Sequence, residues 1–530
     1  MNFRASLIIL ILILTFQKIY TQYPNFRLFP SSIHQIEPTI VRNPVNQQIL
    51  FASAFTINGA VLSEGVYVST NGGLNWIGTD VNSGIPTQNH GGDPGPIIDK
   101  NGVFLLTHIG YSQAGMFANY STNLGTNWSN NYTIYTANDV DKGAPGTDNA
   151  SASPYYGRSY LAFTVFSPPF RIVLSYTTNS GISWSSVVNV NNSCGSNRSY
   201  GPSIGVTPNG TVYVIWAATT PSSPFTEDKI GIANSTNGGV NWNVNECAID
   251  CNGIRTTTFS PWGIRVNSNP VIDIDKTGGP RNGWMYIAIT NKNLAPAGSD
   301  PDIVLHRSTD NGTTWSPGTR VNQDSINNGR NQFFPAIRVD ENGGVNIIYY
   351  DNRIFSDSAD VYLSRSDNGG FSWNDYRISD RRFIPKSLTG VGQGNMGDNI
   401  GLTSGNGNLY PVWMSDYTGK FQIWSAIINY TTIGINKIGS DVPKSYTLNQ
   451  NYPNPFNPET IIKFEVPKSD YLKIVVYDIS GKEIRTLVDQ QINAGIYEVK
   501  FDGSNLASGM YFYKLISESY SETRKMVLVK

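Results

Sequence analysis

Short apolar stretches separated by polar turns make up most of the chain. Residues 65–68 (GVYV) and 303–306 (IVLH) are two examples, and each is followed by a turn sequence and then by another short apolar stretch. Apolar runs of this length, bounded by Gly, Asn, Asp and Ser, are typical of β-strands. The pattern therefore predicts an all-β protein built from many short strands.

One eight-residue sequence motif, called the phrase below, recurs six times within this pattern. It reads hydroxyl residue, any residue, Asn or Asp, any residue, Gly, two further residues and Trp, and its copies start 52, 56, 58, 73 and 58 residues apart. A near-regular spacing of this size indicates a repeat architecture. The copies begin at Ser69, Ser121, Thr177, Ser235, Ser308 and Ser366.

Each copy has the chemistry of a turn between two strands. Asn or Asp at the third position can hydrogen-bond backbone amides, and Gly at the fifth position adopts a positive φ without steric cost. Trp at the eighth position can bury its ring and donate its N–H to a carbonyl. We therefore expect structural roles for Ser69, Asn71, Gly73, Trp76, Asn123, Trp128, Asn179, Trp184, Asn237, Trp242, Asp310, Trp315, Asn368 and Trp373.

The phrase resembles the Asp-box, or bacterial neuraminidase repeat, of sialidases and related β-propellers. Five copies carry Asn where that family most often has Asp, and only Asp310 keeps the acid. The resemblance implies a sialidase-like β-propeller with the boxes on the edge far from the functional site. Because enzymes and binding proteins share the box, it predicts the fold rather than an activity.

A second repeat precedes the first. A proline opens an apolar strand roughly 30 residues before most boxes, where it costs no interior hydrogen bond of the sheet. Each unit then has four strands, as in a propeller blade, and the box joins the third to the fourth. These prolines are Pro38, Pro94, Pro145, Pro202, Pro270 and Pro335.

A seventh unit after the sixth box lacks both a box and a fourth strand. Residues 25–29 (NFRLF), near the start of the chain, resemble the fourth strands of the other units. We therefore expect seven blades, closed by this N-terminal strand, because closure removes the exposed sheet edges. Six blades, as in sialidases proper, are the alternative.

The first residues have the pattern of a secretory signal peptide. Arg4 precedes an apolar run from Leu7 to Leu14 that is too short to span a bilayer, and cleavage is expected near Thr21. A retained membrane anchor is the alternative. The expected organisation is a signal peptide at 1–21, the propeller at 22–430 and a linker at 431–445.

Residues 446–530 form a different module. Alternating strands separated by Gly-containing turns predict a small Ig-like β-sandwich. The run NYPNPFNP, the turn YDISGK, the segment LASGMYFYKL and the basic last strand closely resemble the type A C-terminal sorting domain of the type IX secretion system. The resemblance implies binding to that machinery and a product secreted from, or held on the outer membrane of, a Gram-negative bacterium. A structural Ig-like domain without a sorting role is the alternative.

Charge and cysteine content narrow the functions further. The net charge is −1 over 530 residues and no basic stripe occurs, so nucleic-acid binding is not expected. Cys194, Cys247 and Cys251 allow one disulfide and leave one thiol, and their spacing fits no common zinc site. We expect no metal, no cofactor and a monomeric propeller.

Candidate chemistry lies on the rim opposite the boxes. Glu37 and Asp93 directly precede prolines of the second repeat, and Asp398 holds a similar place in the last unit. These three carboxylates should converge on the mouth of the central channel, where they suit acid–base catalysis, cation binding or contact with sugar hydroxyls. They are the candidate catalytic residues, with solvated strand caps as the alternative reading.

Other residues of this rim are candidates for ligand binding. Trp262 could stack on a sugar, or it could pack within its loop. Asp351 and Arg353 could contact a ligand, or they could form a local ion pair. The candidate ligand-binding residues are His90, Trp262, Asp351 and Arg353, and the remaining rim positions are His34, Asp139, Asp141, Lys142, Arg265, Arg330, Asp416 and Tyr417.

Sialidase activity is not expected. A sialidase needs an arginine triad, and the family's first triad arginine lies where the first inner strand begins. Here residues 35–38 (QIEP) contain no arginine. Two functions stay open: a secreted or cell-surface module that binds glycans or surface polymers, and a glycoside hydrolase (exo-sialidase-like) or lyase that uses the rim carboxylates.

Overall fold

The computed structural model describes residues 23–530 except 83–89, 389–393, 395, 431–432, 434, 440–441 and 504–505. Regular structure in these residues consists of thirty-nine strands. Nowhere in the described ranges is there a helix long and apolar enough to cross a membrane. The expected signal peptide at 1–21 lies outside the described residues.

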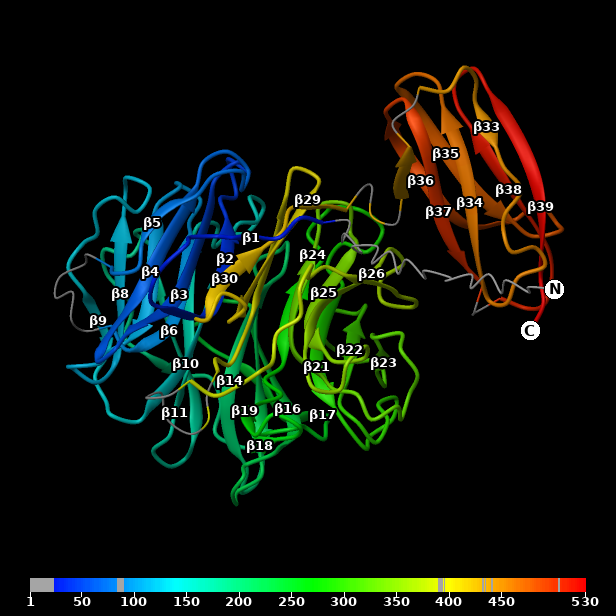
Figure 1. Cartoon of the computed structure of the whole chain (residues 1–530). Coiled ribbons are helices and arrows are strands. Elements are labelled where there is room, and N and C mark those ends of the chain that lie inside the picture. The colour runs from blue at the N-terminus through cyan, green and yellow to red at the C-terminus, as the bar shows by residue number, and fades with distance from the viewer. Residues whose placement is uncertain are drawn as a thin grey trace, which may run out of the picture.

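The strands from Phe26 to Asn429 form seven larger antiparallel sheets that follow one another along the chain, and a separate two-stranded sheet of β18 (Thr256–Phe259) and β19 (Ile264–Val266) lies between the fourth and fifth of them in the sequence (Figure 1). The second strand of each larger sheet is apolar and almost fully buried, because it lies between two strands of its own sheet and between the faces of neighbouring sheets. In order, the sheets are β2 (His34–Arg42), β3 (Leu50–Asn58), β4 (Val61–Ser69), β5 (Ile77–Thr79); β6 (Gly92–Ile98), β7 (Phe104–Ile109), β8 (Met116–Ser121), β9 (Tyr132–Tyr135); β10 (Val140–Thr147), β11 (Ser159–Val165), β12 (Arg171–Thr177), β13 (Val188–Asn189); β14 (Arg198–Val206), β15 (Val212–Thr219), β16 (Glu227–Ser235), β17 (Asn243–Asp250); β20 (Val271–Ile274), β21 (Met285–Asn291), β22 (Asp302–Ser308), β23 (Thr319–Arg320); β24 (Gln332–Val339), β25 (Val345–Asp351), β26 (Asp360–Ser366), β27 (Asn374–Arg377); and β28 (Gly401–Gly405), β29 (Asn408–Ser415), β30 (Gln422–Ser425), β1 (Phe26–Arg27), with β31 (Ile428–Asn429) also on β29.

The first strands of the seven sheets close a ring. Strand β2 contacts β6, and contacts continue through β10, β14, β20 and β24 to β28, which contacts β2 again. Strand β1 pairs with β30, with Phe26 opposite Ser425, so the start of the chain completes the last sheet, and β1 lies beside the yellow β29 and β30 in Figure 1. The described part of the chain is thus an all-β propeller followed by a sandwich.

The hydrophobic core of the propeller lies between neighbouring sheets. Ile215 and Ile230 of the fourth sheet pack against Ile287 and Val304 of the fifth, for example. Burying one such side chain stabilises the fold by about 1.5–3 kcal/mol. The inner strands are less buried, and β10 is partly exposed along its whole length. The centre of the ring is therefore open to polar side chains.

All six boxes form the same turn, between the third and fourth strands of the first six sheets. In the fourth sheet, Ser235 Oγ accepts a hydrogen bond from the Gly239 N–H at 2.8 Å and donates to Asn237 Oδ1 at 2.9 Å, while Asn237 Oδ1 accepts from the Asn241 N–H at 2.9 Å. The same bonds recur in the other five boxes. The fifth-position glycines all have φ between 76° and 90°, as expected.

The box tryptophans differ in how they use the indole N–H. Trp76 and Trp128 donate it to the carbonyl of the box glycine at 3.0 Å. Trp184, Trp242 and Trp373 bury the N–H without a hydrogen-bond partner. All five tryptophans pack their rings, but only Trp76 and Trp128 also form the indole hydrogen bond. Ring packing is therefore the shared role of these tryptophans.

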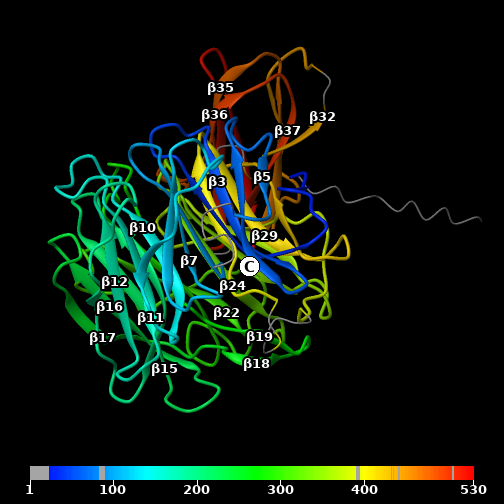
Figure 2. The same cartoon turned by 90° about the vertical axis from the view of Figure 1, so that its left-hand side faces the viewer.

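The C-terminal module is a sandwich of two four-stranded sheets with its own core, seen as a second body beside the propeller (Figures 1 and 2). The sequence places a linker at 431–445, but part of that range belongs to the sandwich, because β32 pairs with β37. Strand β32 (INKIG) has the polar residues Asn436 and Lys437 in its middle and no clear alternation, so its pattern does not predict a strand. The sheets are β32 (Ile435–Gly439), β37 (Gly495–Asp502), β34 (Glu459–Val466), β33 (Thr447–Leu448); and β36 (Glu483–Ile492), β35 (Asp470–Tyr477), β38 (Gly509–Ile516), β39 (Ser521–Leu528).

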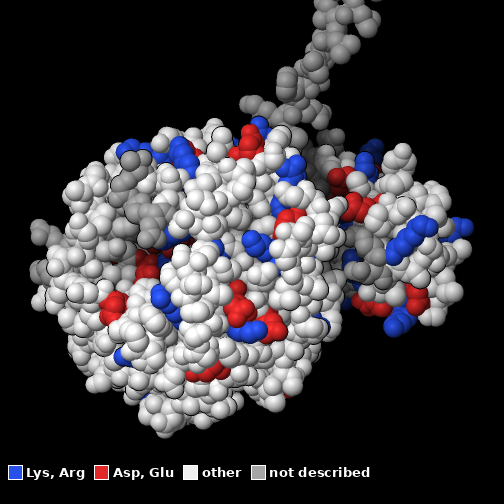
Figure 3. Space-filling view, turned by 90° about the horizontal axis from the view of Figure 1, so that it is seen from below, with Lys and Arg blue, Asp and Glu red and all other residues white. Residues whose placement is uncertain are grey.

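Covalent and charge features agree with the expectations for an exported protein. Cys194 and Cys247 form a disulfide, with Cα atoms 5.6 Å apart, and Cys251 is a buried free thiol. On the face shown in Figure 3, charged side chains are scattered among uncharged ones and gather into no large patch of one sign.

Candidate functional site

A pocket of about 580 Å³ lies where the inner strands of the first sheets begin. The start of β2 pairs with the end of β3, and the end of β3 pairs with the start of β4, whereas the box follows the end of β4. The pocket is therefore on the rim opposite the boxes. It is lined by Glu37, Phe55, Gly91, Gly92, Asp93, Ile109, Asp141, Lys142, Phe166, Arg198, Tyr200, Thr219, Phe225, Arg255, Arg265 and Asp398.

A larger groove of about 810 Å³ lies between the fourth and fifth sheets, beside the fifth box. Its titratable lining side chains are Tyr213, Asp250 and His306 alone, and they form no cluster. The rim pocket is smaller, but it brings four carboxyl groups and four cations together. We therefore take the rim pocket as the candidate site.

A repeated β-bulge aims side chains into this pocket. In each bulge two residues of the inner strand lie opposite one residue of the second strand, and bulges of this kind re-aim side chains beside functional sites. The first bulged residue has a positive φ, which costs about 1–3 kcal/mol for a residue other than glycine. The five bulged residues, with their φ values, are Glu37 (54°), Asp93 (51°), Lys142 (53°), Gly201 (61°) and Phe334 (55°).

Four of the six prolines of the second repeat belong to these bulges, whereas Pro145 lies further along β10, opposite Leu161. Pro38, Pro94, Pro202 and Pro335 are the second bulged residues, inside the strand rather than at its start as expected. An inner strand is the edge of its sheet, and a bulge on an edge tolerates a residue without an N–H. Pro270 alone directly precedes its strand, β20.

Lys142 joins two of the expected carboxylates. Its Nζ lies 3.2 Å from Asp93 Oδ1 and 2.7 Å from Asp398 Oδ2, and Arg265 Nη2 lies 2.6 Å from the same Asp398 oxygen. The Lys142 backbone N–H donates to Asp93 Oδ2 at 2.7 Å. Asp398 Oδ1 is buried and has no hydrogen-bond partner. This oxygen is available to accept a hydrogen bond from a ligand.

The carboxyl groups of the pocket fall into two protonation classes. Burial raises the pKa of Glu37 to about 8, although Lys142 opposes the shift. Burial and then the charge of Asp93 raise the pKa of Asp141 to about 7. Burial also disfavours the charged form of Asp398, but Lys142 and Arg265 outweigh it and hold the pKa of Asp398 well below its usual range. A neutral acid and an ionised carboxylate therefore share one pocket near neutral pH.

Two further arginines were missed by the sequence analysis. The Arg198 guanidinium stacks between the rings of Phe170 and Phe225 at 4.3 and 4.2 Å, and that of Arg255 lies 4.2 Å from the Tyr200 ring centroid. Neither guanidinium has an ion pair with a carboxylate among the described residues. The phase of the second repeat carries a signal for Arg198, because it lies just ahead of the fourth-sheet bulge.

The three candidate catalytic residues converge as expected, and the pocket also contains Asp141, Lys142 and Arg265 of the wider rim set. Their catalytic role stays a prediction. The other rim positions, His34, Asp139, Arg330, Asp416 and Tyr417, do not line the pocket.

Two candidate ligand-binding residues lie away from the pocket surface. His90 is fully buried behind it, with its ring stacked on that of His108 at 4.0 Å, rather than open on the rim. Trp262 packs against Phe333 and donates its indole N–H to the Asp357 carbonyl at 2.9 Å. Loop packing, rather than sugar stacking, describes its position.

Asp351 and Arg353 are also away from the pocket. Arg353 contacts Asp351 Oδ2 at 2.7 Å and Asp375 Oδ2 at 2.6 Å, and its guanidinium lies 4.1 Å from the Tyr362 ring centroid. Asp351 is fully buried. The pair therefore ties strands of the sixth sheet together and leaves no free charge for a ligand.

Comparison with protein families places residues 450–530 in the family described as the secretion system C-terminal sorting domain. This confirms the expected type IX sorting domain. The chain is therefore an exported protein, released from or held on the surface of a Gram-negative bacterium. No curated protein sequence matches the chain.

Solved structures resemble a large part of this chain in fold. An ulvan lyase of polysaccharide lyase family PL25, bound to a GlcA–Rha3S unit, is 11% identical with a TM-score of 0.50, over 77% of this chain and 96% of that one. A Penicillium chrysogenum α-L-arabinanase is 14% identical (TM-score 0.42, 65% and 97% covered), and the leech intramolecular trans-sialidase is 11% identical (TM-score 0.43, 67% and 70% covered). At such identities the likeness concerns the fold alone, which is that of a β-propeller.

Proposed function

We propose that the propeller binds an acidic sugar unit of an extracellular polysaccharide in the rim pocket and cleaves the chain there by acid–base chemistry. The proposal rests on three carboxyl groups that line one pocket and differ in pKa. The pKa of Glu37 is raised to about 8, that of Asp141 is raised to about 7, and that of Asp398 is lowered. Carboxyl groups whose surroundings separate their pKa values are the usual sign of an acid and a base with different tasks.

The charge of the pocket favours an anionic sugar. Lys142, Arg198, Arg255 and Arg265 supply four positive charges, and the two carboxylates paired with Lys142 supply two negative charges. Protonated Glu37 adds no charge and Asp141, with a pKa of about 7, adds about half a negative charge, so the pocket carries a net charge of roughly +1 to +2 near neutral pH. Planar guanidinium groups suit carboxylate or sulfate oxygens, so Arg198 and Arg255 are the expected contacts for the acidic group of the sugar.

Glu37 and Asp141 would divide the proton transfers. Glu37 holds its proton at neutral pH, so it can donate to the leaving glycosidic oxygen. Asp141, with a pKa of about 7, can accept a proton from water or from a sugar carbon. Asp398 is held by Lys142 and Arg265 and orients the substrate through its unpartnered oxygen. One proton donor and one proton acceptor are what a glycoside hydrolase and a lyase each need, so the proposal covers both reactions.

Binding without cleavage is the second candidate. It is favoured by the small exposure of Glu37, 4%, which restricts direct contact with a glycosidic oxygen. In this case the pocket holds the acidic sugar through its arginines, and the propeller acts as an adhesion or capture module on the cell surface.

The test is a panel of neutral, uronic-acid-containing and sulfated polysaccharides, measured for binding by calorimetry and for cleavage by chain length. An unsaturated sugar end identifies a lyase, and a new reducing end without unsaturation identifies a hydrolase. We expect binding of the acidic polymers alone, weakened by Arg255→Met, and cleavage abolished by Glu37→Gln. Cleavage that persists in both Glu37→Gln and Asp141→Asn would show that these residues are not the acid and the base. Equal binding of neutral and acidic polymers would refute the proposed preference for an acidic sugar.

A further inference from the structure

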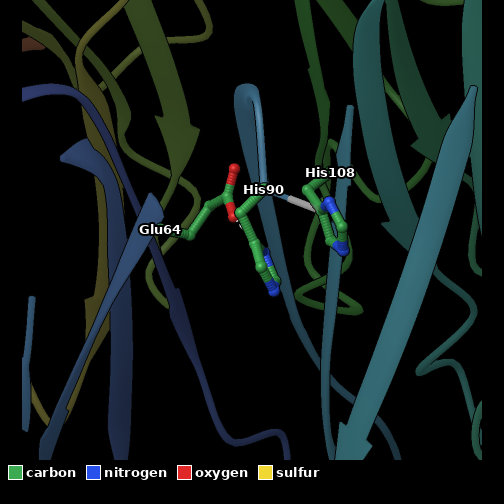
Figure 4. Close-up of side chains that lie close together, drawn as sticks. All are labelled: Glu64, His90 and His108. Atoms are coloured by element: carbon green, nitrogen blue, oxygen red, sulfur yellow. Dashed lines mark ion pairs between the residues drawn. The ribbon is translucent and has the colours of Figure 1, made fainter. Parts of the chain in front are cut away.

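A buried group of three potential metal ligands lies behind the rim pocket. Glu64 comes from β4, His90 directly precedes the β6 bulge, and His108 comes from β7 opposite that bulge (Figure 4). All three side chains are fully buried, and one ligand atom from each lies within 4.8 Å of the others. Within the described residues this is the one such group of at least three His, Cys, Asp or Glu side chains.

Three polar atoms of this group have no hydrogen-bond partner, namely Glu64 Oε2 and both ring nitrogens of His90. Glu64 Oε2 is in contact with His90 Nδ1, but the geometry is not that of a hydrogen bond. A buried polar group without a partner costs about 1–3 kcal/mol. One ion can bind Glu64 and one ring nitrogen of His90, because the two nitrogens of an imidazole point in different directions.

His108 has oxygen atoms beside both ring nitrogens. Its Nδ1 lies 3.0 Å from the Ile109 carbonyl, and its Nε2 lies 3.3 Å from the amide oxygens of Asn119 and Asn131. Asn119 is held in place because its amide nitrogen donates to the Ser129 carbonyl at 2.9 Å, whereas the Asn131 nitrogen has no partner and its amide can turn. Binding of an ion by His108 would therefore replace one of these hydrogen bonds. Glu64 is also held in place, because its Oε1 accepts the Gly92 N–H at 3.0 Å.

We propose that Glu64, His90 and His108 bind a divalent transition-metal ion, with Zn²⁺ the preferred one. Two imidazoles and one carboxylate are a common ligand set for zinc, and bonds of about 2.0–2.2 Å place ligand atoms roughly 3.3 Å apart, within about 1.5 Å of the present spacing. The ion would tie the first sheet to the second. It would also hold the segment from Gly91 to Asp93, which forms part of the pocket wall.

The proposal is independent of what the pocket binds. It is tested on the full-length protein purified without chelators or added metal, by elemental analysis. We expect close to one zinc ion per chain, loss of the ion with phenanthroline, and a lower melting temperature that Zn²⁺ restores. Replacement by Co²⁺ should give the visible absorption of a low-coordinate site with nitrogen and oxygen ligands.

Variants separate a specific site from adventitious binding. His90→Gln and His108→Gln should each lower the zinc content at least tenfold, whereas His306→Gln should leave it unchanged. His306 is the matched control, because it is also buried with an unpartnered Nε2 but has no carboxylate and second histidine beside it. Wild-type protein that holds less than a tenth of an ion per chain, and takes up neither Zn²⁺ nor Co²⁺ on dialysis, would overturn the proposal even if the variants fail to fold. Equal metal loss in His306→Gln would overturn it as well.

Discussion

Two repeats run through the propeller, and they differ in what they repeat. The box turns repeat both backbone and side chains: the Ser or Thr hydroxyl and the Asn or Asp oxygen make the same bonds in all six copies. The inner-strand bulges repeat only the backbone. Their bulged residues are Glu37, Asp93, Lys142, Gly201 and Phe334, which share a positive φ and no chemistry.

The contrast separates scaffold from site. In the box, the Ser or Thr hydroxyl and the Asn or Asp oxygen form hydrogen bonds within the same eight residues. Every copy therefore needs these residue types, and these groups are not available to bind a ligand. A bulge fixes only a direction, so each copy can carry a different side chain, and three adjacent copies bring Glu37, Asp93 and Lys142 to one pocket. Phe334 has the same backbone and packs in the core, so the bulge by itself does not mark a functional residue.

The largest effect should come from the protonated acids. Glu37→Gln keeps the shape and neutrality of the side chain but removes its transferable proton, so we expect cleavage of an acidic polysaccharide to fall about 10²–10⁴-fold. Initial rates on the best substrate of the panel measure this. The matched control is Asp310→Asn in a box, which should leave the rate unchanged. If Asp310→Asn lowered the rate as much as Glu37→Gln, the boxes would not be purely structural and this distinction between scaffold and site would be wrong.

The next effect concerns the stability of the pocket. Lys142→Met leaves Asp93 without a cation, while Asp398 keeps its ion pair with Arg265, and an uncompensated buried charge costs about 3–5 kcal/mol. Denaturant unfolding followed by tryptophan fluorescence measures the loss. The control is Lys229→Met, which removes an ion pair with Asp250 on the exposed surface and should cost no more than about 1 kcal/mol. Equal losses in the two variants would mean that the pocket charges are solvated.

A smaller effect is expected in a box. Ser235→Ala removes the acceptor for the buried Gly239 N–H and should cost about 1–3 kcal/mol of unfolding free energy without changing ligand binding. Ser235→Thr should restore stability, because Thr177 makes the same bonds in the third box. Ser222→Ala, at an exposed position, is the neutral control. Weakened ligand binding in a folded Ser235→Ala protein would contradict a purely structural box.

The smallest effect should come from the one box acid. Asp310 is exposed, and hydrogen bonds from Thr314 hold its pKa near 2. The other five boxes make the turn with Asn, so Asp310→Asn should leave the melting temperature unchanged between pH 5 and 8. A clear drop in that range would show that the carboxylate charge itself stabilises the fifth box.

The sequence predicts the fold and part of the site. The box is encoded within eight residues, so its turn, its glycine and its place between strands could be predicted from the residues themselves. The convergence of Glu37, Asp93 and Asp398 could be predicted from the phase of the second repeat. The ion pairs between cations and acids could not be predicted, because Lys142 and Arg265 lie more than a hundred residues from Asp398 in the sequence.

The metal-ligand group could not be predicted for a similar reason. Glu64, His90 and His108 show no motif spacing, and they meet only because β4 and β7 lie in neighbouring sheets. His90 was instead expected on the open rim, since its position next to the loop carries no information about burial. Burial also decides the pKa values, and it depends on packing from all sides rather than on the residue.

The most direct measurement is the pH dependence of unfolding free energy for the wild type and for Glu37→Gln. The folded pKa of Glu37, about 8, exceeds the ordinary value of about 4.3 in an unfolded chain. The folded protein therefore binds more protons than the unfolded chain in this window, so the contribution of Glu37 is complete below pH 4 and is lost as the pH rises through 8. We predict that wild-type stability falls more steeply than that of Glu37→Gln between pH 5 and 8. Parallel curves would show that Glu37 is ionised throughout, which would contradict a protonated acid in the pocket.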